Sequence, residues 1–130
     1  MIPTRYPDDP TIGNDEILWR RIHPDWIVPD QNTGRPRVSS AAFDNSSDGT
    51  PTSIHLAVVA LHHGNSADII LESFPRYSMA ALTAGNARNV GQGVLPAPQN
   101  NDPSHGYIAG EKTKRVKRSL AGACVWVGTP

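Results

Sequence analysis

Polar residues in three separate segments have the chemistry that a small ligand pocket requires. An arginine offers a fork of donors for a carboxylate or phosphate, a serine offers a hydroxyl, and a histidine can give or take a proton near neutral pH. If the segments meet, we expect a pocket for an anionic or nucleotide-like ligand; otherwise they form the solvated faces of ordinary strands. The candidate ligand-binding residues are Arg20, Arg21, His23, Ser39, Ser40 and His105.

Alternation along a strand limits which of these residues can act together. Neighbouring side chains on a strand point to opposite faces. Only one of Arg20 and Arg21, and only one of Ser39 and Ser40, can therefore face a shared pocket. We expect such a pocket to combine one arginine and one serine hydroxyl with the imidazole of His105.

A second group of basic residues could bind an anion elsewhere on the chain. Arg88 lies in the glycine-rich segment 85–93. This segment matches neither the G-x-G-x-x-G pattern nor the lysine-containing phosphate loop, and it is typical of a turn or a weak anion site. The others lie on the outer face of a predicted C-terminal helix, where only Tyr107 is near enough to stack on a base, so nucleic acid is not the expected partner. The candidate anion-binding residues are Arg88, Lys114, Arg115 and Arg118.

The sequence assigns no catalytic residue, no metal site and no cofactor, and it leaves open whether the protein is an enzyme. His55 and His62, placed on one predicted helix, would lie about 10 Å apart along its axis, too far for two ligands of one zinc ion. The single cysteine, Cys124, lies on the apolar face of its predicted helix and is expected to be a small buried hydrophobic residue. The chain contains no G-x-S-x-G nucleophile motif.

Three blocks of sequence carry a resemblance. The blocks RRIHP (20–24), VSSAAF (38–43) and PSHGYIAG (103–110) resemble recurring blocks of a family of small, uncharacterised bacterial proteins, and this resemblance implies no particular chemistry. The chain is similar, much more loosely, to the ADP-ribosyltransferase pattern of an early arginine, a serine pair on another strand and a late glutamate. The residues that this second resemblance implies are Arg20 or Arg21, Ser39 or Ser40, and Glu111.

Two main helices must position these residues. The clearest helix is predicted over 50–64, with Pro51 in its first turn and Gly64 as a left-handed stop. Its inward face is predicted to carry Ile54, Ala57, Val58 and Leu61. The second is an amphipathic helix over about 112–127, whose last residues, 125–127, could be extended instead.

Four to five short strands complete a predicted α+β domain with long Pro/Gly-rich loops. Residues 1–14, which hold three prolines, are expected to form an extended arm, and residues 15–130 a single domain. Segment 67–74 could pair with 76–83 as a hairpin, a short helix is expected at 84–88, and the glycines and prolines that follow predict a loop. The strands are predicted over 16–22, 38–43, 67–74, 76–83 and 105–110.

Length and charge exclude several classes of protein. The 130 residues fit one domain, and the 12 basic and 12 acidic side chains cancel, which argues against a nucleic-acid coat or a polybasic membrane anchor. The charge is nevertheless uneven, with a net −5 over residues 1–75 and +5 over residues 76–130. The longest apolar run is far too short to span a bilayer, and no secretory leader is evident, so we expect no membrane contact and a cytoplasmic location.

These patterns favour a small bacterial binding or interaction module, such as a subunit or adaptor of a defence, toxin or modification system. We expect a protein partner or self-association, because the proline-rich arm and the uneven charge suit a contact surface. Two alternatives remain open. One is a domain with a pocket for an anionic or nucleotide-like ligand, with a degenerate transferase as one form of it, and the other is nucleic-acid binding through the basic C-terminal helix.

Overall fold

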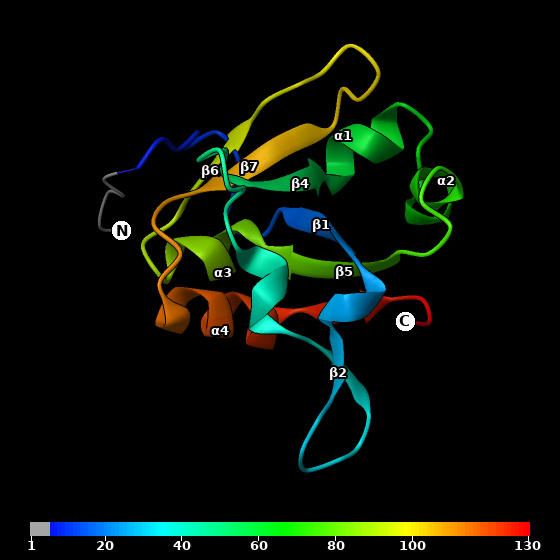
Figure 1. Ribbon diagram of the computed structural model, residues 1–130. Helices are drawn as coiled ribbons and strands as arrows, with labels where there is room; N and C mark the ends of the chain where they lie inside the picture. Colours follow the sequence, from blue (N-terminus) through cyan, green and yellow to red (C-terminus); the bar gives the residue numbers. More distant parts are fainter. Residues whose placement is uncertain (1–5) are drawn as a thin grey trace.

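A six-stranded sheet runs through the centre of the molecule, in the computed structural model that describes residues 6–130 (Figure 1). Its strand order is β6-β7-β4-β1-β5-β8, and every neighbouring pair is antiparallel. The strands are β1 (Ile17–Ile22), β4 (Thr52–Leu56), β5 (Ser78–Thr83), β6 (Gly93–Pro96), β7 (His105–Ala109) and β8 (Val125–Val127). A separate antiparallel pair consists of β2 (Ile27–Pro29) and β3 (Pro36–Val38).

Within the described residues 6–130, four short helices and two 3₁₀ turns cover the sheet. The helices are α1 (Ala57–His62), α2 (Ala67–Glu72), α3 (Ala84–Arg88) and α4 (Lys114–Ala123), and the 3₁₀ turns are η1 (Pro24–Trp26) and η2 (Ser40–Phe43). Ser66, Thr83 and Thr113 each accept a hydrogen bond from a backbone N–H in the first turn of α2, α3 and α4, which is why these helices begin where they do. The chain is therefore a single small α+β domain.

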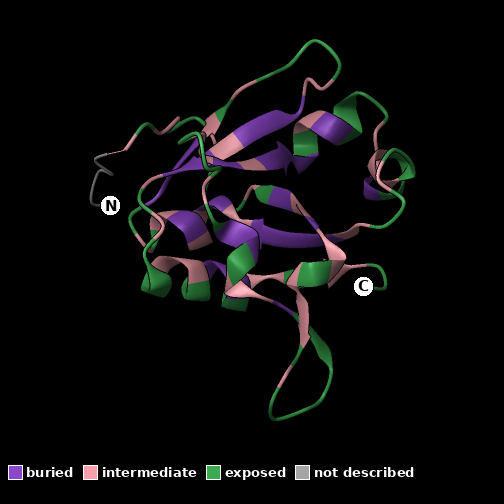
Figure 2. Cartoon of the chain, viewed as in Figure 1, coloured by how far each residue is buried: buried purple, intermediate pink, exposed green. Residues whose placement is uncertain are grey.

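The alternation of side chains along the strands separates two hydrophobic layers. Leu18 lies in the layer that α3, α4 and η2 cover, whereas its neighbour Trp19 lies in the layer that α1 and α2 cover. The larger layer includes Phe43 and Leu120, both fully buried, and the smaller one includes Met79. Figure 2 shows the central strands buried between these layers.

The hairpin formed by β2 and β3 extends away from the body of the domain (Figure 1). Its turn is stabilised by Asp30, whose carboxylate accepts the backbone N–H groups of Asn32 and Thr33. The indole Nε1 of Trp126 donates to the Pro36 carbonyl at 3.0 Å, so β8 is tied to the base of the hairpin.

The N-terminal segment covers the β6 edge of the sheet. The backbone N–H of Asp9 donates to the Val94 carbonyl, and a Cβ at Gly93 would lie only 1.9 Å from the Pro7 carbonyl oxygen. Only glycine fits this close approach. Of the predicted arm 1–14, residues 1–5 lie outside the described part of the chain, and residues 6–14 pack on α3 and β6.

Several predicted elements are confirmed. The strands predicted over 16–22, 76–83 and 105–110 correspond to β1, β5 and β7, and the helix predicted over 84–88 is α3. The C-terminal helix ends at Ala123, and the alternative of an extended end is correct, because residues 125–127 form β8. Eight strands are present in residues 6–130, rather than four or five.

Other predicted elements are wrong. Segment 50–64 is a strand followed by a helix of only six residues, so Val58 and Leu61 are more than half exposed instead of facing inward. Segment 67–74, predicted as a strand, contains α2 and cannot pair with β5. Segment 38–43, also predicted as a strand, is mostly a 3₁₀ turn, and β6 lies where a loop was predicted. Short helices hold too little periodicity to be distinguished from strands without their tertiary partners.

No helix among residues 6–130 is both long enough and apolar enough to cross a membrane.

Candidate functional site

A hollow of about 490 Å³ lies on the α2 side of the sheet. The sheet contributes Arg21, Ser53, His55 and His105 to its wall. The remaining walls come from α2, from the segment that follows α2, and from the loop 97–104 between β6 and β7. Three elements distant in the sequence thus surround one polar cavity, which we call the α2 pocket.

Strand pairing explains why these sheet residues meet. His55 on β4 and His105 on β7 are direct partners in the register, and Ser53 lies two residues from His55 on the same strand. Trp19 on β1 pairs with His55, so Arg21, two residues further along β1, is directed to the same face. The register therefore places one arginine, one serine and two histidines on a single face.

The guanidinium of Arg21 is oriented by two neighbours. Its Nε donates to His55 Nε2 at 3.2 Å, and its central carbon lies 3.8 Å from the centre of the Phe74 ring. Burial lowers the pKa of Arg21, while Tyr77 and Asp102 oppose this shift; arginine stays charged at neutral pH. Within residues 6–130, its terminal nitrogens Nη1 and Nη2 make no hydrogen bond and no ion pair.

His55 is held between Arg21 and the loop before β7. Its Nδ1 lies 3.1 Å from Ser104 Oγ and 3.2 Å from Asp102 Oδ2, and Ser104 Oγ donates to the other carboxylate oxygen at 2.7 Å. Because Nε2 accepts from Arg21, the neutral imidazole carries its proton on Nδ1 and donates it to Ser104 Oγ, which in turn donates to Asp102. The ring thereby fixes the direction of the Arg21 side chain.

We expect the folded protein to lose stability in mild acid through His55. Burial lowers the pKa of His55 from 6.5, helped by the charges of Arg21, His105 and Arg20 and opposed by Asp102. In the unfolded chain the pKa of His55 is about 6.5, so below that pH the unfolded chain binds more protons than the folded one. The contribution of neutral His55 to the free energy of unfolding is therefore present above pH 6.5 and falls as the pH decreases. Urea unfolding at about pH 7 and about pH 5 measures this loss.

The variant His55→Gln is expected to show a smaller change between the two pH values. His62→Gln is the matched control, because His62 is exposed at the end of α1. An equal acid-induced loss in wild type and His55→Gln would contradict the prediction.

Ser53 and His105 form a second pair in the same pocket. The Nε2 of His105 lies 3.2 Å from Ser53 Oγ, and its Nδ1 lies 2.9 Å from the Ala97 carbonyl oxygen. The rings of Tyr107 and His105 pack at a right angle to each other, with their centroids 4.9 Å apart. No three His, Cys, Asp or Glu side chains among residues 6–130 are grouped so that they could hold a metal ion.

The structure separates the other sequence-predicted ligand residues from this pocket. Arg20 points to the opposite face of the sheet, where it donates to the carbonyls of Ala42 and Ser53. His23 accepts the backbone N–H of Asp25 and packs edge-on against Tyr77 at 5.3 Å. Of the six candidates, Arg21 and His105 line the α2 pocket.

The two serines lie near η2 rather than on a strand. Ser39 accepts the backbone N–H of Ala41 at the start of η2, and Ser40 lines a different hollow. Glu111 follows β7 and lines neither hollow. The three roles implied by the ADP-ribosyltransferase resemblance therefore do not meet in the α2 pocket.

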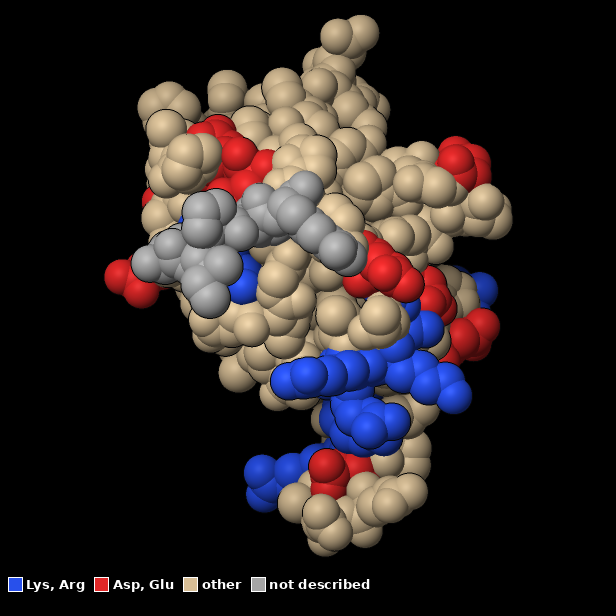
Figure 3. All heavy atoms as spheres, turned by 90° about the vertical axis from the view of Figure 1, so that its left-hand side faces the viewer, with Lys and Arg blue, Asp and Glu red and all other residues tan. Residues whose placement is uncertain are grey.

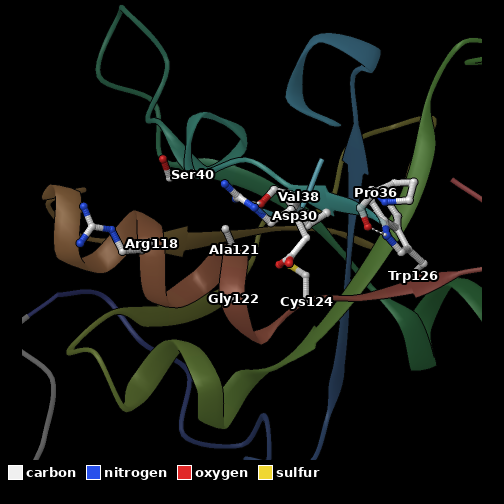
Figure 4. Close-up of a pocket in the computed structure, with 10 residues that line it drawn as sticks. Asp30, Pro36, Val38, Ser40, Arg118, Ala121, Gly122, Cys124 and Trp126 are labelled. Atoms are coloured by element: carbon white, nitrogen blue, oxygen red, sulfur yellow. Dashed lines mark hydrogen bonds between the residues drawn. The ribbon is translucent and has the colours of Figure 1, made fainter. Parts of the chain in front are cut away.

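The second hollow, of about 550 Å³, lies between the β2–β3 hairpin and α4. Figure 4 shows Trp126 beside Pro36 at one end, Arg118 toward the other, and Cys124 between them. The Sγ atom of Cys124 lies 3.4 Å from the Leu120 carbonyl oxygen. Burial raises the pKa of the Cys124 thiol to about 12, against a weaker opposing effect of Arg20.

Cys124 is expected to be chemically inert in the folded protein. Only the thiolate attacks alkylating reagents, and a pKa of about 12 leaves almost none of it at neutral pH. Intact-mass measurements after treatment with iodoacetamide at about pH 8 should show at least about tenfold slower labelling than in urea-unfolded protein. Labelling of the folded protein at the rate of the unfolded chain would contradict this prediction.

The predicted anion-binding residues occupy two different environments. Lys114, Arg115 and Arg118 are exposed on α4, and Figure 3 shows lysine and arginine side chains gathered on this part of the surface. Lys117, on the same helix, is paired with Asp44 at 2.6 Å. Arg88 instead binds Asp8 and the N-terminal segment inside the fold.

Sequence reasoning missed Ser53, His55 and Asp102 as pocket residues. The pattern Ser53-x-His55 could have indicated two polar residues on one face of a strand, because alternate residues on a strand share a face. Ser104 and His105 follow it much later in the sequence. The helix predicted over 50–64 hides this signal, because residues two apart on a helix do not share a face. Comparisons with models of protein families, with curated proteins and with solved structures gave no match for this chain.

Proposed function

We propose that the protein binds a small anionic ligand, a carboxylate or a phosphate of at most nucleotide size, in the α2 pocket. The observation that carries the proposal is the guanidinium of Arg21, which is fixed by His55 and Phe74 and keeps both terminal nitrogens unused within residues 6–130. A preoriented arginine loses little conformational entropy when it binds an anion and forms charge-assisted hydrogen bonds.

The surroundings of Arg21 support this proposal. The pocket volume of about 490 Å³ is in the usual range for a small-molecule site. Asp102, whose carboxylate opposes the lowering of the Arg21 pKa, already accepts a hydrogen bond from Ser104 Oγ and lies 3.2 Å from His55 Nδ1. Ile70 and Phe74 supply apolar lining beside the polar groups, and the Phe74 ring packs against the Arg21 guanidinium.

Replacement of Arg21 by glutamine tests the proposal. Inorganic phosphate and adenosine monophosphate serve as probes, titrated by calorimetry and by NMR of the histidine ring protons. Loss of a charge-assisted, two-pronged contact is expected to weaken binding at least about tenfold. Arg115→Gln, on the exposed face of α4, is the matched control and should bind both probes like wild type.

Two outcomes contradict the proposal. One is that neither probe perturbs the signals of His55 and His105 in wild type at millimolar concentration. The other is that Arg21→Gln binds the probes as tightly as wild type does. Binding lost in Arg115→Gln instead would point to the basic surface of α4.

The interaction-module hypothesis, the bacterial source, the cytoplasmic location and a partner of the α4 surface stay predictions. They concern other surfaces of the molecule, its source and its location, and they do not depend on the α2 pocket.

A further inference from the structure

We infer that Ser53 and His105 form a nucleophile–base pair and that the protein hydrolyses a small anionic ester in the α2 pocket. This inference rests on the proposed function for the site that holds the anionic end of the substrate. The reacting pair itself is defined by the geometry of β4, β7 and the loop between β6 and β7.

The Ala97 carbonyl determines the tautomer of His105. A carbonyl oxygen can only accept, so the ring nitrogen 2.9 Å away, Nδ1, carries the proton in the neutral imidazole. Nε2 then has a lone pair, and it faces Ser53 Oγ at 3.2 Å. A hydroxyl that donates to an unprotonated imidazole, itself oriented by a third group, is the arrangement that activates a serine.

The backbone holds both members of the pair rigidly. Ser53 pairs with Tyr107 across β4 and β7, and its carbonyl accepts Nη1 of Arg20 at 2.9 Å. His105 is 6% exposed, and Tyr107 packs edge-on against its ring. Neither ring nor hydroxyl can turn away without breaking a contact, so the pair is preorganised.

The pair and the anion-binding arginine belong to one cavity. Ser53, His105 and Arg21 all line the α2 pocket, and Nη1 and Nη2 of Arg21 make no hydrogen bond within residues 6–130. An ester with a carboxylate or phosphate at one end could bind Arg21 while its carbonyl carbon meets Ser53 Oγ. The substrate class that fits is therefore a short ester with a negative charge on the acyl or alcohol part.

The reaction balances in two steps. Ser53 Oγ forms a bond to the ester carbonyl carbon, its proton passes to His105 Nε2, and the bond to the alcohol breaks as that proton moves to the leaving oxygen. Water then attacks the acyl-serine and gives its proton to Nε2, and the proton returns to Ser53 Oγ as the carboxylic acid leaves. The reaction consumes water and needs no oxidant or reductant.

Covalent labelling is the direct test. Diisopropyl fluorophosphate is neutral and reacts with activated serines. Attack by Ser53 Oγ on its phosphorus is expected to add one diisopropylphosphoryl group to Ser53 and to release fluoride, and peptide mass mapping locates the group. Ser53→Ala should remove the label, and His105→Gln should slow labelling at least about a hundredfold. Ser119→Ala, exposed on α4, is the matched control and should label like wild type.

Because His105 is buried, its variant could fail to fold, so the pH dependence of wild-type labelling supplies a second measurement. A base that must be unprotonated makes the labelling rate fall in acid. A rate independent of pH would overturn the inference, as would the absence of a label on Ser53 in folded protein. Hydrolysis of mono-4-nitrophenyl succinate should be lost in Ser53→Ala and weakened in Arg21→Gln, and its absence in wild type would also overturn the inference.

The two proposals fail in different ways. Ser53→Ala should still bind inorganic phosphate, because it keeps Arg21 and His55, so phosphate binding without labelling overturns the nucleophile–base pair alone. Labelling of Ser53 in a protein that binds no phosphate overturns the anion site and supports the pair.

Discussion

Replacing Arg88 by glutamine is expected to lower the free energy of unfolding by about 2–4 kcal/mol, because it breaks a buried ion pair and several hydrogen bonds at once. The Arg88 side chain is only 8% exposed, and its Nε lies 3.0 Å from Asp8 Oδ1. The same carboxylate oxygen accepts the backbone N–H of Val94 at 2.8 Å. The other guanidinium nitrogens donate to Asp9 O, Ile12 O and Asn14 Oδ1.

Urea unfolding at neutral pH measures this change. Arg115→Gln removes a charge of the same kind from the exposed face of α4 and should change the stability by less than about 0.5 kcal/mol. Arg88→Lys keeps the charge but not the planar fork, so an intermediate loss is expected. A stability of Arg88→Gln equal to that of Arg115→Gln would show that the N-terminal segment contributes nothing to folding.

A helix or strand could be predicted from the sequence where the residues of that element alone indicate its type. The short apolar run 16–22 followed by Pro24 was sufficient to predict β1, and the amphipathic pattern was sufficient to predict α4. Segment 50–64 was not predictable in this way. Its apolar residues suit both a strand and a helix, and only the pairing of β4 with β1 and β7 makes residues 52–56 extended.

The candidate site, too, could be predicted only where a local sequence pattern exists. Residue type predicts Arg21 and His105 as candidates, and the structure places both at the α2 pocket; strand alternation predicts that Arg20 and Arg21 face opposite sides, as they do. Asp102, by contrast, reaches His55 from a loop whose position depends on the register of β4 with β7. Such long-range pairing leaves no local trace in the sequence, so the network around His55 could only be found in three dimensions.

Replacing Arg20 by glutamine is expected to cost about 2–3 kcal/mol of stability. Its guanidinium donates to the Ala42 carbonyl through Nε and Nη2 and to the Ser53 carbonyl through Nη1, at 2.8–3.0 Å. Burial lowers the pKa of Arg20 to about 10, with a smaller effect of Arg21 in the same direction, so the charge persists at neutral pH. A shorter amide would leave two carbonyls without their donors, and relief of the buried charge would offset only part of that loss.

The neighbouring variant Arg21→Gln should show the opposite behaviour, which makes the two arginines controls for each other. Arg21 is partly exposed, and its contacts with Phe74 and His55 are each worth about 1 kcal/mol or less, so we expect a small change in the urea midpoint together with the loss of phosphate binding. Arg20→Gln should unfold more readily yet bind phosphate at low temperature, where it stays folded. If Arg21→Gln proved the more destabilised variant, or if Arg20→Gln lost phosphate binding while folded, then the division of the two arginines between the core face and the pocket face would be wrong.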